Sequence, residues 1–152
     1  MNAENVRNNK QSIIIGSDHA AFELKEKIKK FLTDYGLSVT DIGTSSDASV
    51  NYVDFGKKVA TAVSDNEFEK GILLCGTGLG MSMTANRFPR VRAALCSDIF
   101  GAKMSRLHND SNILVLGGRV IGDILAFEIV ETWLKTPFEG GRHLQRIKTI
   151  DS

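Results

Sequence analysis

Short apolar blocks alternate along the chain with longer stretches in which apolar residues recur every three or four positions. Five blocks rich in aliphatic and β-branched residues predict strands that are buried on both faces. These blocks span residues 12–16, 38–42, 71–75, 92–96 and 112–117. Because a stretch with helical spacing follows each block, the pattern predicts an α/β fold with a five-stranded parallel sheet covered by helices on both faces.

The helices of the second half are predicted from apolar spacing and from end signals. Phe100, Met104 and Leu107 are spaced as the buried face of the helix after the fourth strand. A longer helix follows the fifth strand, and Pro137 and the glycine pair at 140–141 are expected to break it. The charged residues 142–152 then predict one more short helix or an arm.

The composition is typical of one globular domain. The 152 residues are 42% hydrophobic and carry a net charge of +1, so no surface for nucleic acid or membranes is indicated. No apolar run approaches the ~18 residues of a membrane span. Residues 1–11 are polar and are expected to form a disordered extension, followed by one domain over 12–152 with a C-terminal arm at 138–152. The two cysteines form no CxxC pattern, which favours a reducing compartment such as the cytoplasm.

Ligands of such a sheet bind beyond the carboxyl ends of its strands. Polar or glycine-rich residues follow four of the predicted strands and are therefore candidates for a site. They are Ser17, Asp18 and His19; Cys75 with the turn GTGLG; Ser97 and Asp98; and Gly117, Gly118 and Arg119. The turn GTGLG opens a helix, and its amide groups favour an anion such as a phosphate or an oxyanion.

The glycine turn alone does not identify a nucleotide site. A dinucleotide fingerprint needs G-x-G-x-x-G after the first strand, whereas this chain has G-x-G-x-G after the third. The G-K-[ST] sequence of a phosphate-binding loop is absent. A tight strand-to-helix turn without any ligand stays as the alternative to an anion site.

Cys75 favours a chemical role because it stands where the strand ends and the glycine turn begins. A helix N-terminus promotes the thiolate form of cysteine, which can act as a base or a nucleophile. Cys96 fits the usual role of a buried cysteine as a small apolar residue. Two alternatives stay open for Cys75: a redox sensor, and a disulfide or metal pair with Cys96, although further metal ligands at suitable spacing are lacking.

Three basic candidates are expected at the other edge of the sheet. His108 precedes the fifth strand, and Arg142 and Arg146 follow the last long helix. The two arginines are four residues apart and share one helix face, which suits a phosphate clamp. If these residues serve the Cys75 site, they must reach it from a second subunit. The alternative for residues 142–152 is a solvated charged helix.

Four longer motifs occur in order along the chain: GSDHAAFELK, ILLCGTGLGMSMTANR, SRLHNDSNILVLGGRVIG and FEGGRHLQRI. Together they resemble the ribose-5-phosphate isomerase B family, whose wider membership includes isomerases of allose 6-phosphate and galactose 6-phosphate. The likeness extends over about residues 12–150. It implies a Rossmann-like three-layer α/β/α sandwich, a homodimer or tetramer with an active site shared between subunits, and aldose–ketose isomerisation of a phosphorylated sugar without metal or other cofactor.

The resemblance also implies roles for the residues of the glycine turn. Cys75 resembles the base that moves a proton between C1 and C2 of ribose 5-phosphate and ribulose 5-phosphate through a cis-enediolate. Thr77 and the amides of Gly76, Gly78 and Gly80 resemble the anion hole for that enediolate.

Further roles are implied for residues outside the turn. Asp18 resembles the residue that handles the hydroxyl protons of the sugar, and Tyr52 resembles a wall of the sugar pocket. His108 of a partner subunit, assisted by Asn109, resembles the residue that opens the sugar ring. The phosphate grip is implied for His19, Arg119, Arg142 and Arg146.

Two positions depart from patterns seen in relatives. One branch of the family lacks the cysteine and has a glutamate where this chain has Met81. With Cys75 and Met81, this chain resembles the branch that uses cysteine as the base. Relatives commonly carry Tyr-Pro-Asp where this chain has Tyr52, Val53 and Asp54, and a looser loop is expected without the proline.

Two other functions stay open beside a ribose-5-phosphate isomerase. The substrate could be a six-carbon sugar phosphate, such as allose or galactose 6-phosphate, because sequence does not give the depth of the pocket. The chain could also be a catalytically silent regulator that binds a sugar phosphate. The joint presence of Asp18, Cys75, Thr77 and His108 favours an enzyme, since binding alone would need only the arginines.

Overall fold

Five parallel strands form the centre of the computed structural model, which describes residues 12–152. The order across the sheet is β2-β1-β3-β5-β4. The strands are β1 (Ser12–Ser17), β2 (Ser38–Asp41), β3 (Gly71–Cys75), β4 (Ala93–Leu95) and β5 (Ile113–Gly117). All five predicted strands are confirmed, and β4 is shorter than predicted because it is an edge strand that pairs only with β5. The extension expected at residues 1–11 lies outside the described residues.

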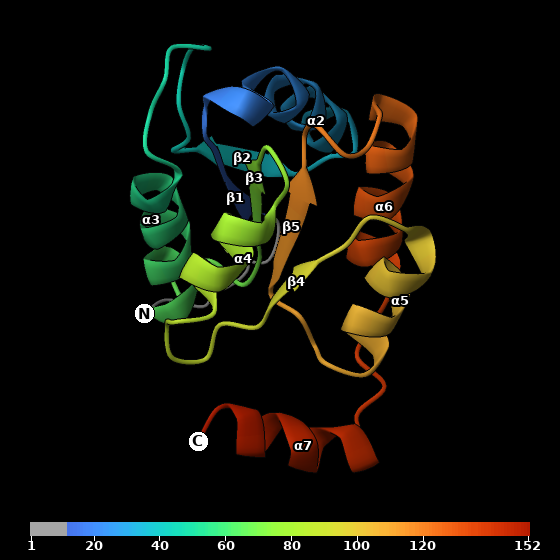
Figure 1. Cartoon of the computed structure of the whole chain (residues 1–152). Helices are drawn as coiled ribbons and strands as arrows, with labels where there is room; N and C mark the ends of the chain where they lie inside the picture. The colour runs from blue at the N-terminus through green and yellow to red at the C-terminus, as the bar shows by residue number, and fades with distance from the viewer. Residues whose placement is uncertain (1–11) are drawn as a thin grey trace.

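Helices cover both faces of this sheet (Figure 1), which confirms the predicted three-layer α/β/α sandwich. One layer contains α2 (Phe22–Asp34), α5 (Ile99–Leu107) and α6 (Asp123–Lys135), and the other contains α3 (Tyr52–Ser64) and α4 (Leu79–Ala85). A short 3-10 helix, η1 (His19–Ala21), follows β1, and α7 (Arg142–Ile150) ends the chain. Within residues 12–152, no helix has the length and apolar character needed to span a membrane.

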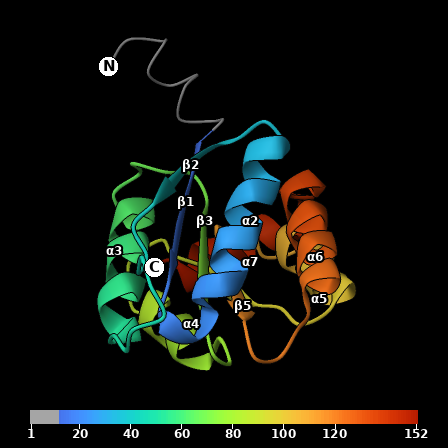
Figure 2. The same ribbon diagram turned by 90° about the horizontal axis from the view of Figure 1, so that it is seen from above.

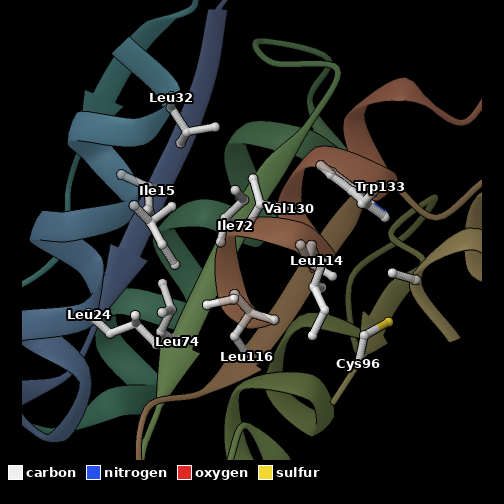
Figure 3. Packing of buried hydrophobic residues seen from close by; sticks show 14 of the residues in the cluster. Ile15, Leu24, Leu32, Ile72, Leu74, Cys96, Leu114, Leu116, Val130 and Trp133 are labelled. Carbon is white, nitrogen blue, oxygen red and sulfur yellow. The ribbon is translucent and has the colours of Figure 1, made fainter. Parts of the chain in front are cut away.

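The inner strands send buried side chains to both layers, so β3 is held rigidly on either face. Ile72 packs toward α2 and α6 together with Ile15 and Leu114, and Trp133 fills the space beside them (Figure 3). The indole N–H of Trp133 donates to the hydroxyl of Ser111 across 2.8 Å, so its polar atom is satisfied inside the core. Close packing of this kind fixes where the end of β3 lies.

The predicted buried face of α5 is wrong. Phe100 is 72% exposed, and the buried residues of this helix are Ala102, Ser105 and Arg106. Arg106 is tolerated there because its guanidinium donates to Asp110 and to the carbonyl oxygen of residue 111. The large apolar side chain at the start of α5 therefore faces outward.

The last helix, α7, lies beyond the amino ends of the strands, below the sheet in Figure 1 and behind it in Figure 2. Gly140 and Gly141 have φ angles of 73° and 55°, a left-handed conformation that glycine adopts without strain. Since α6 ends at Lys135, shortly before Pro137, and α7 begins directly after the glycine pair, the predicted break is confirmed. His143 and Ile147 are the residues that α7 buries.

Candidate active site

A pocket of 370 Å³ opens at the carboxyl edge of the sheet, where β1, β3 and β5 end. It is lined by Asp18, His19, Ala20, Tyr52, Cys75, Gly76, Thr77, Gly80 and Arg119. Its volume falls in the range of about 300–1,000 Å³ that is usual for small-molecule sites. Two larger hollows, of 700 and 560 Å³, lie around Arg90 and Arg92 near the other edge, and a third, of 500 Å³, lies beside His19 and Ser46; none of them contains Cys75. The chemistry of the lining, rather than size, therefore identifies the candidate site.

Cys75 is fixed in this pocket by backbone hydrogen bonds. Its sulfur accepts from the N–H of Gly78 at 3.2 Å, and its carbonyl oxygen accepts from the N–H of Gly118 at 2.8 Å. Gly78 has a φ of 81°, which turns its amide back toward the sulfur. The residue is only 5% exposed, so the sulfur meets solvent or ligand only through the pocket. The geometry orients the sulfur and gives a thiolate a hydrogen-bond donor.

Cys75 and Cys96 lie on opposite faces of the sheet, and β5 separates their strands. Both are free thiols. Cys96 packs in the cluster that contains Leu114 and Leu116 (Figure 3), and burial raises the pKa of its thiol to about 11. A disulfide or metal pair between the two cysteines is therefore wrong, whereas the predicted apolar role of Cys96 is confirmed.

Asp18 and His19 are positioned by the chain around them. One carboxylate oxygen of Asp18 accepts from the amides of Ala20 at 3.1 Å and Ala21 at 3.3 Å, which caps η1. Nδ1 of His19 accepts from the N–H of Val50 at 3.1 Å. Because an accepting Nδ1 carries no hydrogen, the ring proton belongs on Nε2. His19 can therefore offer an Nε2–H donor to a ligand.

Arg119 lies over the glycine turn at the end of β5. Its backbone N–H donates to the carbonyl oxygen of Gly76 at 2.9 Å, and a Cβ on Gly76 would lie 3.5 Å from the Arg119 Cδ. Thr77 is exposed beside it, and its hydroxyl oxygen accepts from the N–H of Leu79 at 3.3 Å. A guanidinium and a hydroxyl thus stand at the opening of α4.

Tyr52 forms one wall of the pocket by packing on Gly80. A Cβ on Gly80 would lie 2.5 Å from the tyrosine ring, so this contact requires glycine. The loop before Tyr52 is held by Asn51, whose side-chain oxygen accepts from the N–H of Val53 at 3.0 Å. A proline at position 53 would stiffen the backbone but would lack that N–H. The hydrogen bond from Val53 to Asn51 therefore restrains the loop in place of a proline.

Met81 offers no carboxylate to the pocket. Its side chain is fully buried between α3 and α4, where a Cβ on Gly56 would lie 3.1 Å from the sulfur. Cys75 is thus the acid–base candidate of the glycine turn.

Four predicted site residues lie away from the pocket, at the amino edge of the sheet: His108, Asn109, Arg142 and Arg146. His108 follows the last turn of α5, and the two arginines are exposed on α7. Figures 1 and 2 show the position of α7 relative to the sheet. The predicted placement of these residues at the edge opposite Cys75 is confirmed, so one chain does not bring all the predicted residues together.

Sequence reasoning did not single out the neighbours of His108. The rings of His108 and His143 stack with centroids 4.3 Å apart, and the carboxylate of Glu139 lies 3.8 Å from one Nε2 and 3.7 Å from the other. The four-residue spacing of Glu139 and His143 was the sequence feature that could have predicted their contact. Ala20, which also lines the pocket, has no chemical signature in the sequence.

Comparison with known proteins supports the same assignment. Residues 13–150 match the family described as ribose/galactose isomerase. The chain is 45% identical over 140 residues to ribose-5-phosphate isomerase B of Escherichia coli (strain K12), a match that covers 92% of this chain and 94% of that protein. It is 41% identical over 140 residues to a D-erythrulose-4-phosphate isomerase of Pectobacterium atrosepticum, covering 91% of this chain and 92% of the relative.

Solved structures agree in both fold and extent. A ribose 5-phosphate isomerase of Thermotoga maritima superposes with a TM-score of 0.90 at 58% identity, covering 92% of this chain and 97% of the other. Ribose-5-phosphate isomerase B of Clostridium thermocellum gives a TM-score of 0.90 at 53% identity, covering 92% and 95%. By its fold and by its sequence, the chain belongs to the ribose/galactose isomerase family.

Proposed function

We propose that the chain interconverts ribose 5-phosphate and ribulose 5-phosphate through a cis-enediolate, with Cys75 as the base and without a metal or other cofactor. The observation that carries this proposal is the place of the Cys75 sulfur. It lies at a strand end, in a pocket that also holds the Asp18 carboxylate, the His19 imidazole and the Arg119 guanidinium. Relatives at 45% and 58% identity are named as ribose-5-phosphate isomerases, which supports the five-carbon substrate.

The reaction removes a proton from the carbon next to a carbonyl group and returns it to the neighbouring carbon. Cys75 takes the proton from C2 of the open-chain aldose and delivers it to C1. Negative charge develops on oxygen in between, and one well-placed donor to such an oxygen contributes about 3 kcal/mol. Because the amide of Gly78 already donates to the sulfur, we assign the enediolate to the Thr77 hydroxyl and the amides of Gly76 and Gly80.

The phosphate and the sugar hydroxyls need their own partners. Within one chain, His19 offers its Nε2–H and Arg119 its guanidinium to the phosphate. Binding energy from this distant group holds the open chain in register for proton transfer. Asp18 moves the hydroxyl protons, and Tyr52 walls the sugar.

The remaining residues reach this pocket from a second subunit. We assign ring opening to His108 of the partner subunit, assisted by its Asn109, and assign a phosphate clamp to its two α7 arginines. A homodimer, alone or within a tetramer, is supported by large apolar side chains that this chain leaves exposed: Leu79 and Met83 on α4, Leu95 on β4, and Ile99 and Phe100 on α5. We place the enzyme in the cytoplasm, since two free thiols suit a reducing compartment.

The test is turnover by the chelator-treated protein. Ribose 5-phosphate should give ribulose 5-phosphate at full rate after dialysis against a chelator, and in D₂O one deuterium should enter at C1 of the ketose. Four-, five- and six-carbon aldose phosphates should be compared by kcat/KM, because one relative is named for a four-carbon substrate. A preference for allose or galactose 6-phosphate would favour the six-carbon alternative. Tight binding without deuterium exchange would identify a silent regulator.

A further inference from the structure

A compact group of two histidines and one glutamate lies at the amino edge of the sheet, away from the Cys75 pocket. Nε2 of His108 and Nε2 of His143 lie 3.8 Å and 3.7 Å from the same carboxylate oxygen of Glu139. The nearest ligand atoms of the three residues all lie within 4.8 Å of one another. The backbone N–H of Glu139 donates to the carbonyl oxygen of Leu107 at 3.1 Å, which ties the start of this segment to the end of α5. We call these three residues the His108 cluster.

His143 is the member of the cluster that has a buried polar atom without a hydrogen-bond partner in residues 12–152. Its side chain is 5% exposed, and its buried Nε2 has no hydrogen-bond partner among the described residues. Buried polar atoms almost always have a partner, so an orphan nitrogen 3.7 Å from a carboxylate oxygen, on a ring stacked against a second imidazole, points to a missing ligand. A neutral imidazole nitrogen is the commonest side-chain ligand of transition metals.

The spacing suits a four-coordinate ion. Metal–ligand bonds of about 2.0–2.1 Å in a tetrahedral site place the ligand atoms about 3.4 Å apart. The two measured nitrogen–oxygen separations exceed this by only a few tenths of an ångström. The side chains of His108 and Glu139 are 40% and 56% exposed, so they can rotate inward while His143 stays fixed. Two imidazoles and one carboxylate also leave a fourth position for water, as in open zinc sites.

We infer that His108, Glu139 and His143 bind one divalent transition-metal ion, with Zn²⁺ as the best fit, and that the bound ion inhibits the enzyme. Two nitrogens and one carboxylate oxygen favour Zn²⁺ over Mg²⁺ or Ca²⁺, which prefer oxygen ligands. Inhibition follows because a metal-bound Nε2 cannot transfer a proton during ring opening. The inhibition rests on the proposed function of His108, whereas metal binding does not.

Binding can be measured without catalysis by using Co²⁺ as a spectroscopic probe of the chelator-treated full chain. The Cys75→Ala protein should bind one equivalent of Co²⁺ with the visible bands of a tetrahedral nitrogen–oxygen site, and Zn²⁺ should displace it. Glu139→Gln and His143→Gln in that background should weaken the affinity by more than about tenfold. Glu139→Gln, at an exposed side chain, covers the case in which His143→Gln does not fold. His19→Gln, which changes the third histidine of the chain, should bind Co²⁺ as before.

Activity provides the second readout. Micromolar Zn²⁺ should inhibit the wild type reversibly, and Glu139→Gln should keep its turnover and lose the sensitivity. Absence of Co²⁺ binding to the Cys75→Ala protein, or an affinity that neither Glu139→Gln nor His143→Gln changes from that of the Cys75→Ala parent, would overturn the metal site. Zinc inhibition that persists in Glu139→Gln would overturn the inhibitory role and assign the effect to a thiol. A chelated wild type with no isomerase activity would contradict the proposed function and leave the Co²⁺ result intact as evidence for the site.

Discussion

The amide of Gly78 points at the sulfur of Cys75, with 3.2 Å between nitrogen and sulfur. The left-handed backbone of Gly78 gives the amide this direction. A Cβ at this position would lie 2.4 Å from the Leu95 side chain, so the turn favours glycine. The sulfur is therefore oriented by the turn itself, before any substrate is bound. Such preorganisation is what a base needs if it is to reach a carbon-bound proton at the right distance.

Replacing this sulfur should remove catalysis. Cys75→Ala should lower kcat by roughly 10²–10⁴-fold, the usual contribution of a positioned base, and Cys75→Ser should also be severe because a hydroxyl is a far weaker acid. Steady-state kinetics with ribose 5-phosphate measures both. The matched control is Cys96→Ala, which should keep kcat because Cys96 lies on the other face of the sheet. Near-normal turnover in Cys75→Ala would remove the thiol from the mechanism.

The second thiol should be unreactive in the folded protein. Burial raises the pKa of Cys96 to about 11, so almost no thiolate is present at pH 8. In the Cys75→Ala background, iodoacetamide should label Cys96 slowly at pH 8 and faster as the pH rises toward 11. Mass spectrometry follows the labelling, with the urea-unfolded protein as the fast-reacting control. Rapid labelling of the folded protein at pH 8 would show that Cys96 is not buried as described.

The contact between Tyr52 and Gly80 should appear in a double-mutant cycle. Gly80→Ala places a methyl group 2.5 Å from the tyrosine ring, so the ring must move and KM should rise. In the Tyr52→Ala background the space is free, and the same change should raise the free energy of unfolding by about 0.5 kcal/mol through helix propensity. Urea unfolding of the four proteins measures the coupling. Equal effects of Gly80→Ala in both backgrounds would mean that the two residues do not touch.

Stability should depend on pH through His143. Burial and the neighbouring His108, Arg142 and Arg146 lower its pKa below 6.5 in the folded chain, opposed by Glu139. The unfolded chain then takes up a proton near pH 6.5 while the folded chain does not, so the free energy of unfolding falls as the pH drops below that value. His143→Gln should lose less stability than the wild type between pH 7.5 and 5.5, measured by urea unfolding in a chelating buffer. An equal loss in both proteins would contradict the lowered pKa.

The strands and the carboxyl-edge residues could be predicted because both follow from local pattern. Apolar runs such as 71–75 can be buried only between two layers, and parallel strands bring their ends to one edge. The buried face of α5 could not be predicted in this way. Apolar spacing selected Phe100, but tertiary packing buries Arg106 on the opposite side of that helix. Apolar residues on an exposed face of a helix, such as Phe100, recur with the same spacing as residues of the core.

Long-range polar pairs were also beyond the sequence pattern. Lys25 is completely buried, and its ammonium group pairs with Asp41, sixteen residues away, as well as with its neighbour Glu26. The contact of His108 with Glu139 likewise joins segments that are distant along the chain. The periodicity of the sequence does not predict such contacts, because they depend on how the helices pack against the sheet and against each other. The distance of His108 from Cys75, in contrast, followed from strand direction alone.

The central claim is that the active site combines Cys75 of one chain with His108 of another, and hybrid assembly tests it most directly. Cys75→Ala and His108→Ala proteins, each inactive alone, should be unfolded together and refolded as a mixture. Half of the dimers should then be hybrids with one complete site, so about a quarter of the wild-type activity per chain should return. If both residues worked within one chain, no hybrid would contain a complete site. Absence of recovered activity in verified hybrid dimers would contradict the shared site.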